Sequence, residues 1–212
     1  LTTSSAASDV YKRQTWEYTS ARIITPSNKT VNPGNEITVC FKVPDGTGHW
    51  PAIWMLPQGF IEGNKTWPQD GEIDLMEARG RVPQAIGAAI HFANSNNSHQ
   101  YISHEVTVPM NVNFQDKFHS ITFKWIEDAI EMYLDTNNEP FYSEGKNSTP
   151  FNNANYPFNE EFYLLFNVAS GGNFDSNQID QSKYCNDEQC SNLSIPDKGR
   201  FLIDYIEIKS ID

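Results

Sequence analysis

Three carboxylates lie close together within one hydrophobic segment of the chain. In "GEIDLMEARG" they are Glu72, Asp74 and Glu77, and apolar residues separate them. The apolar residues indicate a partly buried strand, where a carboxylate removed from water is costly unless something compensates it. The acids therefore lie either on the wet side of an ordinary strand or in a cleft where they have a chemical function.

Strand geometry places two of the acids on one face and needs an irregularity to place the third there. Side chains alternate along a strand, so Glu72 and Asp74 share a face and Glu77 falls on the other. A β-bulge at Leu75–Met76 would return Glu77 to the face of the other acids, and such bulges are common beside active sites. We therefore predict a bulge at these two residues.

Paired carboxylates on one face suit hydrolysis of a glycosidic bond. The Glu72 and Glu77 backbones would lie about 13 Å apart, and side chains leaning inward could bring the carboxylates to about 5 Å, as in retaining glycosidases. One carboxylate would attack the anomeric carbon, while the other protonates the leaving oxygen and later activates water. Asp74 between them could hold a proton and keep the two pKa values apart.

Tryptophans flank the acids in the sequence. Trp50 and Trp54 lie in "GHWPAIWMLP", and Trp67 precedes a proline in a loop. Ligand sites combine aromatic walls with a few polar groups, and sugar rings offer C–H faces to such walls. Trp50 and Trp54 are four residues apart and would share a face of one strand, where core packing is the alternative role. Trp67 is the better stacking candidate because of its place in a loop.

The segments that must position these residues alternate between apolar and polar side chains with a period of two, which is typical of half-buried strands. Apolar and polar residues alternate in 37–43, 121–125 and 130–134. A further strand is predicted at 200–209, and 162–169 is apolar on both faces except at Asn167, which indicates a central strand beside a cleft. Turn-forming residues separate these segments and no long helical pattern occurs. We therefore predict one all-β domain, a sandwich or jelly roll.

Composition excludes several classes of partner. The chain has 212 residues and a net charge of -12. A chain so acidic has no general attraction for nucleic acid or anionic membranes, and no apolar run is long enough to span a bilayer. We expect the charge to serve solubility outside the cell.

The chain has three cysteines. Cys185 and Cys190 close a short loop, and either a disulfide or reduced thiols fits; Cys40 is expected to be buried and unpaired. Their spacing does not support metal ligation.

Residues 1–14 lack an initiator Met and an apolar segment. We expect them to be a leader outside the fold and 15–212 to be a single catalytic domain.

The motif "GEIDLMEARG" resembles the signature of glycoside hydrolase family 16, the laminarinase-like retaining endo-glucanases. Four other segments resemble parts of the same family in the same order: "YTSARIIT", "GTGHWPAIWMLP", "FNVASGGNF" and "DYIEIK". The resemblance extends from about residue 16 to residue 209. It implies an all-β jelly-roll sandwich, concanavalin A-like, with a concave glycan-binding cleft.

Carried over residue by residue, the resemblance also implies roles. Glu72 would be the nucleophile, Glu77 the general acid/base and Asp74 their helper. Five further residues match positions that bind substrate: Arg22, Trp54, Trp67, His91 and Asn167. His91 matches a histidine near the acid/base, and a purely structural strand histidine is the alternative.

The activity implied by the resemblance is retaining endo-hydrolysis of β-1,3-linked glucan by a two-glutamate double displacement. The protein would be a secreted monomer that needs no cofactor. One alternative is a non-catalytic β-glucan-recognition module of the same fold, although such modules have typically lost catalytic carboxylates. Another is hydrolysis of mixed-linkage glucan or a galactan, because agarases and carrageenases share the extra residue before the last glutamate.

Two departures from the family pattern bear on structure. Family members usually have strands before the segment that matches "YTSARI", so we expect the first strand or strands to be missing. The family's structural calcium often uses that N-terminal region with an aspartate near the C-terminal strand. Asp204 matches that aspartate, and an ordinary turn or edge acid is the alternative.

Overall fold

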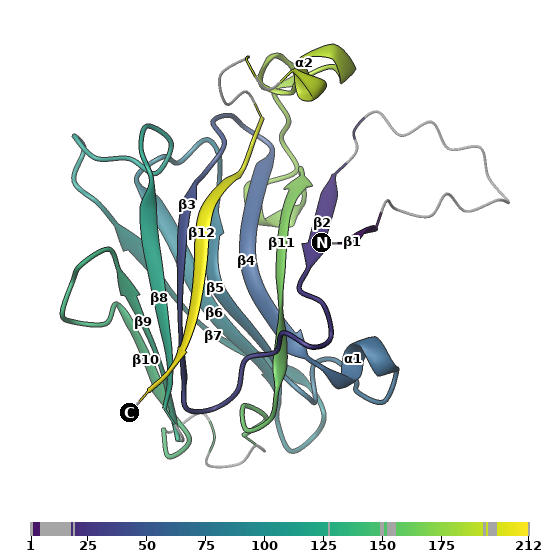
Figure 1. Ribbon diagram of the computed structural model, residues 1–212, viewed down its shortest axis with the longest axis vertical. Helices are drawn as coiled ribbons and strands as arrows, with labels where there is room; N and C mark the ends of the chain where they lie inside the picture. Colours follow the sequence, from purple (N-terminus) through teal and green to yellow (C-terminus); the bar gives the residue numbers. More distant parts are fainter. Residues whose placement is uncertain are drawn as a thin grey trace, which may run out of the picture.

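Two antiparallel sheets pack face to face in the computed structural model (Figure 1). It describes residues 2–4, 18, 20–126, 128–148, 151, 156–192, 194 and 199–211. The seven-stranded sheet has the order β1 (Thr2–Ser4), β2 (Ala21–Ile24), β11 (Phe162–Ser170), β4 (His49–Pro57), β5 (Glu72–Ala78), β6 (Ala85–Ala93) and β7 (His99–Thr107). The five-stranded sheet has the order β10 (Tyr142–Gly145), β9 (Ala129–Leu134), β8 (His119–Ile126), β3 (Asn35–Lys42) and β12 (Leu202–Ser210).

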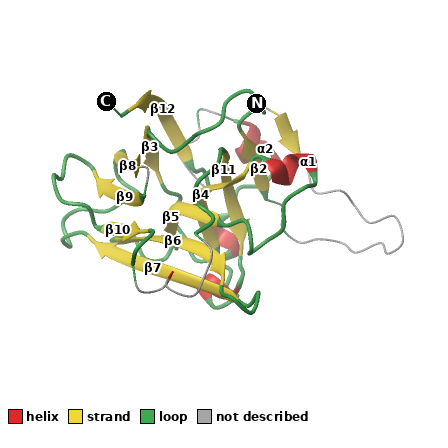
Figure 2. Cartoon of the chain, turned by 90° about the horizontal axis from the view of Figure 1, so that it is seen from below, coloured by secondary structure: helices red, strands yellow, loops and turns green. Residues whose placement is uncertain are grey.

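Helices are short and lie at the margins of the sheets (Figure 2). They are α1 (Gly59–Glu62), α2 (Asp187–Ser191) and the 3₁₀ turns η2 (Asn173–Asp175) and η3 (Gln181–Lys183). In the described part of the chain, no helix is long and apolar enough to cross a membrane. The predicted all-β sandwich is confirmed.

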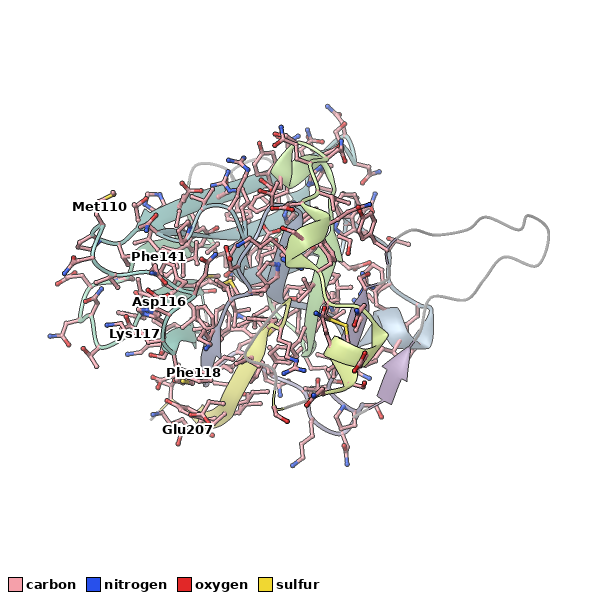
Figure 3. All side chains as sticks on the ribbon, turned by 90° about the horizontal axis from the view of Figure 1, so that it is seen from above. Met110, Asp116, Lys117, Phe118, Phe141 and Glu207 are labelled. Carbon is pink, nitrogen blue, oxygen red and sulfur yellow. A yellow bond between two sulfur atoms is a disulfide. The ribbon has the colours of Figure 1, made fainter. Side chains whose placement is uncertain are left out.

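The core fills the space between the two sheets (Figure 3). The alternating strands β3, β8 and β9 each bury every second side chain, as their period of two predicts. The largest fully buried side chains include Trp125, Phe41, Phe114, Phe123, Phe158 and Phe162. Side chains such as Met110, which is 91% exposed, lie at the periphery.

Strand β11 is central, as its doubly apolar sequence predicts. It lies between β2 and β4 in the seven-stranded sheet. Leu164 faces the core between the sheets, whereas Tyr163 and Leu165 pack in a small cluster with Leu56 of β4. The strand is therefore apolar on both faces because both faces are covered there.

The ends of the chain bear on two further predictions. Thr2–Ser4 pair with β2, although they lie in the segment predicted to be a leader. Most of residues 1–14 and the boundary at residue 15 lie outside the described residues, so the domain bounds stay a prediction.

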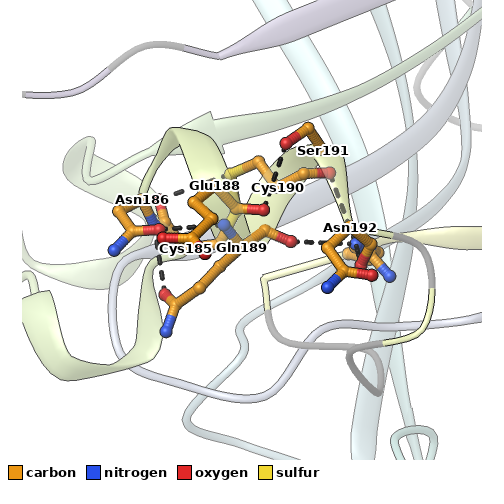
Figure 4. The surroundings of a disulfide bond; sticks show 8 residues. Cys185, Asn186, Glu188, Gln189, Cys190, Ser191 and Asn192 are labelled. Atoms are coloured by element: carbon orange, nitrogen blue, oxygen red, sulfur yellow. Dashed lines mark hydrogen bonds between the residues drawn. A yellow bond between two sulfur atoms is a disulfide. The ribbon is translucent and has the colours of Figure 1, made fainter.

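The cysteine loop adopts the disulfide-bonded alternative (Figure 4). Cys185 and Cys190 are joined, and α2 between them begins with a capping box formed by Asn186 and Gln189. Cys40 is a free thiol on β3. It is half-buried, so the prediction that it is buried was wrong: it points away from the core, between the core residues Val39 and Phe41.

Replacing Phe123 by alanine tests the core. Phe123 is fully buried and lies edge-on to Trp125. We expect the Phe123→Ala variant to lose about 3–5 kcal/mol of unfolding free energy, through lost burial and a cavity. Denaturant unfolding measures this loss. Ile126→Ala on the same strand is the control, because Ile126 is 42% exposed and should cost under about 1 kcal/mol. Equal losses would contradict this placement of the core.

Candidate active site

The predicted bulge lies in the middle of β5. Asp74 and Met76 pair with consecutive residues of β4, which leaves Leu75 without a partner on that strand. The register with β6 also shifts between Asp74 and Glu77. Leu75 and Met76 are both fully buried in the core, so Glu77 returns to the face that carries Asp74. The bulge at Leu75–Met76 is confirmed, and we call the outer face of the seven-stranded sheet the acid face.

Small residues lie beside the acids across the sheet. Glu77 pairs with Gly87 of β6 and Ala52 of β4, whereas Asp74 pairs with Ala89 of β6 and Trp54 of β4. Neighbouring strands are only about 4.8 Å apart, so large side chains beside Glu77 would cover it. The register therefore leaves room for a ligand over Glu77.

Glu72 receives a hydrogen bond from the loop before β5. The indole N–H of Trp67 donates to Glu72 Oε2 at 2.5 Å. The Trp67 ring is 45% exposed, so much of its surface is free to contact a ligand. The loop position that favoured Trp67 in the sequence thus places it directly against the first acid.

Glu72 and Asp74 both have raised pKa values. Burial raises the pKa of Glu72 to about 7, and the neighbouring charge of Asp74 adds to this, while His91 and the Trp67 hydrogen bond oppose it. Burial first, and the charge of Glu77 second, raise the pKa of Asp74 well above its usual range. Asp74 is only 4% exposed. Because the more deeply buried acid loses more hydration on ionising, burial disfavours the charge on Asp74 more than the charge on Glu72.

Glu77 has a separate environment on the other side of Asp74. The indole N–H of Trp50 donates to Glu77 Oε1 at 2.9 Å. Burial raises the pKa of Glu77, and the Trp50 hydrogen bond, His91 and Arg79 partly oppose the rise. Trp50 stacks on Phe174 with ring centroids 4.9 Å apart, which fixes the indole. Sequence analysis did not assign Trp50 to the site, although its spacing from Trp54 had indicated a shared face.

His91 lies against Asp74. Its Nε2 is 2.9 Å from Asp74 Oδ2, and its Nδ1 is 2.8 Å from Nε2 of His99 on β7. The His99 ring is in turn 4.6 Å from the Trp67 ring. His91 is thus part of the acid cluster, as the resemblance implied. His99 was missed, because its position in the sequence after "NSNNS" resembles a turn and its contacts depend on the pairing of β6 with β7.

Arg22, Trp54 and Asn167 form a second group on the acid face. The Trp54 indole N–H donates to Asn167 Oδ1 at 2.7 Å, and the Arg22 guanidinium lies 4.9 Å from the Trp54 ring centre. Asn167 pairs with Arg22 on one side and with Ala52 on the other. Since Ala52 also pairs with Glu77, Arg22 and Asn167 lie in the cross-strand row of Glu77, with Arg22 about 14 Å from β5. Trp54 lies in the neighbouring row and pairs with Asp74. Their binding of substrate stays a prediction.

Metal ligation has one geometric candidate among the described residues. Glu72, Asp74 and His91 offer ligand atoms within 4.8 Å of one another. Their oxygens and nitrogens are already joined by hydrogen bonds, which suits proton transfer. Asp204 lies at an irregularity of β12, between Ile203 and Tyr205, and is not in that group. The calcium site therefore stays a prediction.

A cavity of about 920 Å³ lies where β2, β11 and the start of β12 meet. Its lining includes Ile23, Phe166, Asn167, Tyr184 and Ile203, and none of the three acids. The paired carboxylates lie outside it, so we assign the chemistry to the acid face.

Comparisons with known proteins agree with this site. The family model "Glycosyl hydrolases family 16" matches residues 4–186, a match that starts inside the predicted leader. The chain is 38% identical over 165 residues to "Glucan endo-1,3-beta-glucosidase A1" of Niallia circulans, covering 75% of this chain and 23% of that protein. It is 32% identical over 174 residues to "Beta-1,3-glucan-binding protein" of Penaeus monodon, covering 73% and 47%. The chain thus spans less than half the length of both relatives.

A solved structure supports the fold. The catalytic domain of an endo-1,3-beta-glucanase (laminarinase) from Thermotoga petrophila RKU-1 superposes with a TM-score of 0.75 at 28% identity. The superposition covers 97% of this chain and 74% of that one. The jelly-roll prediction is thereby confirmed.

Replacing Trp50 by phenylalanine tests the hydrogen bond that the Trp50 indole donates to Glu77. The variant keeps a ring against Phe174 but loses the N–H that stabilises the Glu77 carboxylate. We expect the pKa of Glu77 to rise further, by about one unit, as followed by ¹³C NMR of the carboxyl carbon. Trp54→Phe, which removes a donor to Asn167 instead, should leave that titration unchanged. A pKa of Glu77 that stays the same in Trp50→Phe would contradict the assigned hydrogen bond.

Replacing Glu72 by glutamine tests the cost of burying this acid. Its pKa in the folded protein is about 7, above the ordinary 4.5, so protonation favours folding. The stability that this contributes is fully present below about pH 4.5 and is lost as the pH rises to about 7. We expect the unfolding free energy of the parent, relative to Glu72→Gln, to fall by about 2 kcal/mol over this range.

Denaturant unfolding at several pH values measures this difference. The control is Glu207→Gln, which changes an exposed acid on β12 and should follow the parent at every pH. Parallel curves for the parent and Glu72→Gln would show that Glu72 is not perturbed.

Proposed function

The chain belongs to glycosyl hydrolases family 16, and on that basis we propose that it hydrolyses β-1,3-linked glucan with retention of configuration. The observation that carries the proposal is the set of three carboxylates on one face, each with its own hydrogen-bond donor or proton. The relative from Niallia circulans, named an endo-1,3-beta-glucosidase, supports the choice of linkage.

Glu72 acts as the nucleophile in this proposal. It accepts a hydrogen bond from the Trp67 N–H, which favours its ionised form. Its carboxylate attacks the anomeric carbon, forming a glycosyl ester as the bond to the leaving oxygen breaks.

Glu77 acts as the general acid and then as the general base. Burial raises its pKa, so a larger fraction of it carries a proton near neutral pH than for an ordinary glutamate. It donates this proton to the leaving glucan oxygen. It then removes a proton from water, whose oxygen attacks the anomeric carbon, releases Glu72 as a carboxylate and yields a product with the original anomeric configuration.

The cross-strand row suits an extended polymer. Arg22, Asn167 and Trp54 lie on the β2 side of the acids, and Trp67 and Tyr101 lie on the β7 side. A glucan chain crossing the strands would pass over both groups. We infer that the enzyme cleaves within a chain and that these residues, with His91 holding Asp74, bind its sugars.

Location and partners are part of the same proposal. The Cys185–Cys190 disulfide is typical of an oxidising compartment, which supports a secreted protein. The partner is then an extracellular β-glucan, acted on by a monomer that has no nucleic-acid or membrane partner and requires no cofactor. If a structural calcium ion is present, Asp204 is the residue proposed to contact it.

A β-glucan-recognition module is the second candidate. It is favoured by the Penaeus monodon relative, which is named a β-1,3-glucan-binding protein. The retained Glu72, Asp74 and Glu77 favour the enzyme, because binding alone needs no paired carboxylates with raised pKa values.

Reducing-end release from laminarin tests the proposal. We expect the parent to release sugar ends from laminarin faster than from lichenan or agarose, and ¹H NMR to detect the β-anomer first. Glu72→Gln should lower kcat by at least about a thousandfold while still binding laminarin. Glu207→Gln should match the parent. Activity retained in Glu72→Gln would refute the nucleophile, and a folded parent that binds laminarin without cleaving it would favour the recognition module.

A further inference from the structure

His99 contacts the acid cluster without a part in the reaction steps. It is the first residue of β7, and its Nε2 lies 2.8 Å from His91 Nδ1. The two imidazole rings are stacked, with centroids 5.1 Å apart and planes 17° from parallel. One of the two nitrogens must therefore donate to the other, and the direction of donation determines the tautomer of His91.

The contact with Asp74 settles that direction. Asp74 Oδ2 lies 2.9 Å from His91 Nε2 and, as a carboxylate oxygen, accepts a hydrogen bond from it. A neutral His91 that carries its hydrogen on Nε2 has a bare Nδ1. His99 must then be the donor in the 2.8 Å contact. The hydrogen bonds from His99 through His91 thus point toward Asp74.

His99 also contacts the other donor to Glu72. Its ring centroid is 4.6 Å from that of Trp67, whose indole N–H reaches Glu72 Oε2. The contacts form a closed ring: His99 touches Trp67 directly and reaches Asp74 through His91. One side chain on β7 therefore supports both the donor to Glu72 and the donor to Asp74.

We propose that His99 is a positioning residue for Glu72: it holds His91 in the Nε2–H tautomer that donates to Asp74, and it seats the Trp67 indole that donates to Glu72. The inference deepens the proposed function, because it rests on Glu72 as the nucleophile. His99 touches no reacting atom and acts only through His91 and Trp67.

Removing His99 would free His91 to take the other tautomer. Its Nε2 would then no longer donate to Asp74, and the Trp67 indole would lose the ring that seats it against Glu72. A carboxylate with fewer donors has a higher pKa. Since the nucleophile must be ionised, activity at acidic pH would fall first.

Few titratable side chains face His99. Among the described residues they are His91 from β6 and Tyr101 from β7, and both are stacked on the His99 ring. Behind His91 are the three acids of β5, and Arg79 acts on Glu77 from the end of that strand. None of them can replace the N–H of His99 at His91 Nδ1 without a rearrangement.

Three variants test the proposal on laminarin. His99→Leu removes the donor, whereas His99→Gln supplies an amide N–H in its place. His104→Leu is the control, because His104 is an exposed histidine on the same strand that points to the opposite face. We expect His99→Leu to lower kcat about tenfold and to move the acidic limb of the pH profile up by roughly one unit. His99→Gln should recover most of both, and His104→Leu should match the parent.

A readout independent of activity separates this proposal from the proposed function. Two-bond ¹H–¹⁵N NMR should report His91 as the Nε2–H tautomer in the parent and in His99→Gln, and a changed tautomer in His99→Leu. Titration of the Glu72 carboxyl carbon should show a higher pKa in His99→Leu. An unchanged His91 tautomer with an unmoved Glu72 titration would overturn the positioning role even in an active enzyme. A parent inactive on every glucan would refute the function alone.

Discussion

The crowding of one buried and two half-buried carboxylates is the constraint on which the site depends. Each would be unstable as a bare anion out of water, and each charge disfavours ionisation of the next. Each carboxylate is compensated by its own hydrogen-bond donor: Trp67 for Glu72, His91 for Asp74 and Trp50 for Glu77. The donors hold the acids in place and give them unequal environments, and unequal acids are what proton transfer requires.

The sandwich makes that arrangement possible because β5 has two different faces. Its inner face contributes Ile73, Leu75 and Met76 to the core, so the strand cannot move without losing that packing. The bulge is stabilised by the same burial, since it places two consecutive apolar residues in the core. The energy that keeps the acids buried against their preference for water therefore comes from the opposite side of the same strand.

Support for the acids also comes from residues far away in the sequence. Phe174 of η2 stacks on Trp50, and Arg79 lies over Phe174 while it pairs with Glu105 of β7. His99 and Trp67 close a similar set of contacts on the other side of Asp74. The two acids proposed for catalysis are thus held by two separate groups of aromatic and basic side chains. Their pKa values can then be adjusted separately.

Sequence alone determined the local features, because they depend on neighbouring residues. The period of two in 37–43 and 121–125 predicted the strands, and the extra residue between Asp74 and Glu77 predicted the bulge, since alternation along a strand is a local property. The motif around Glu72 likewise predicted the family, which the comparisons bear out.

Only the tertiary structure decided which side chains meet across strands. Trp50 reaches Glu77 because β4 pairs with β5, and His99 reaches His91 because β7 pairs with β6 in one register out of several that the sequence allows. The half-buried position of Cys40 is a further case, since its exposure depends on which face of β3 the other sheet covers. Such contacts join residues distant in the chain, and no local pattern of residue types encodes them.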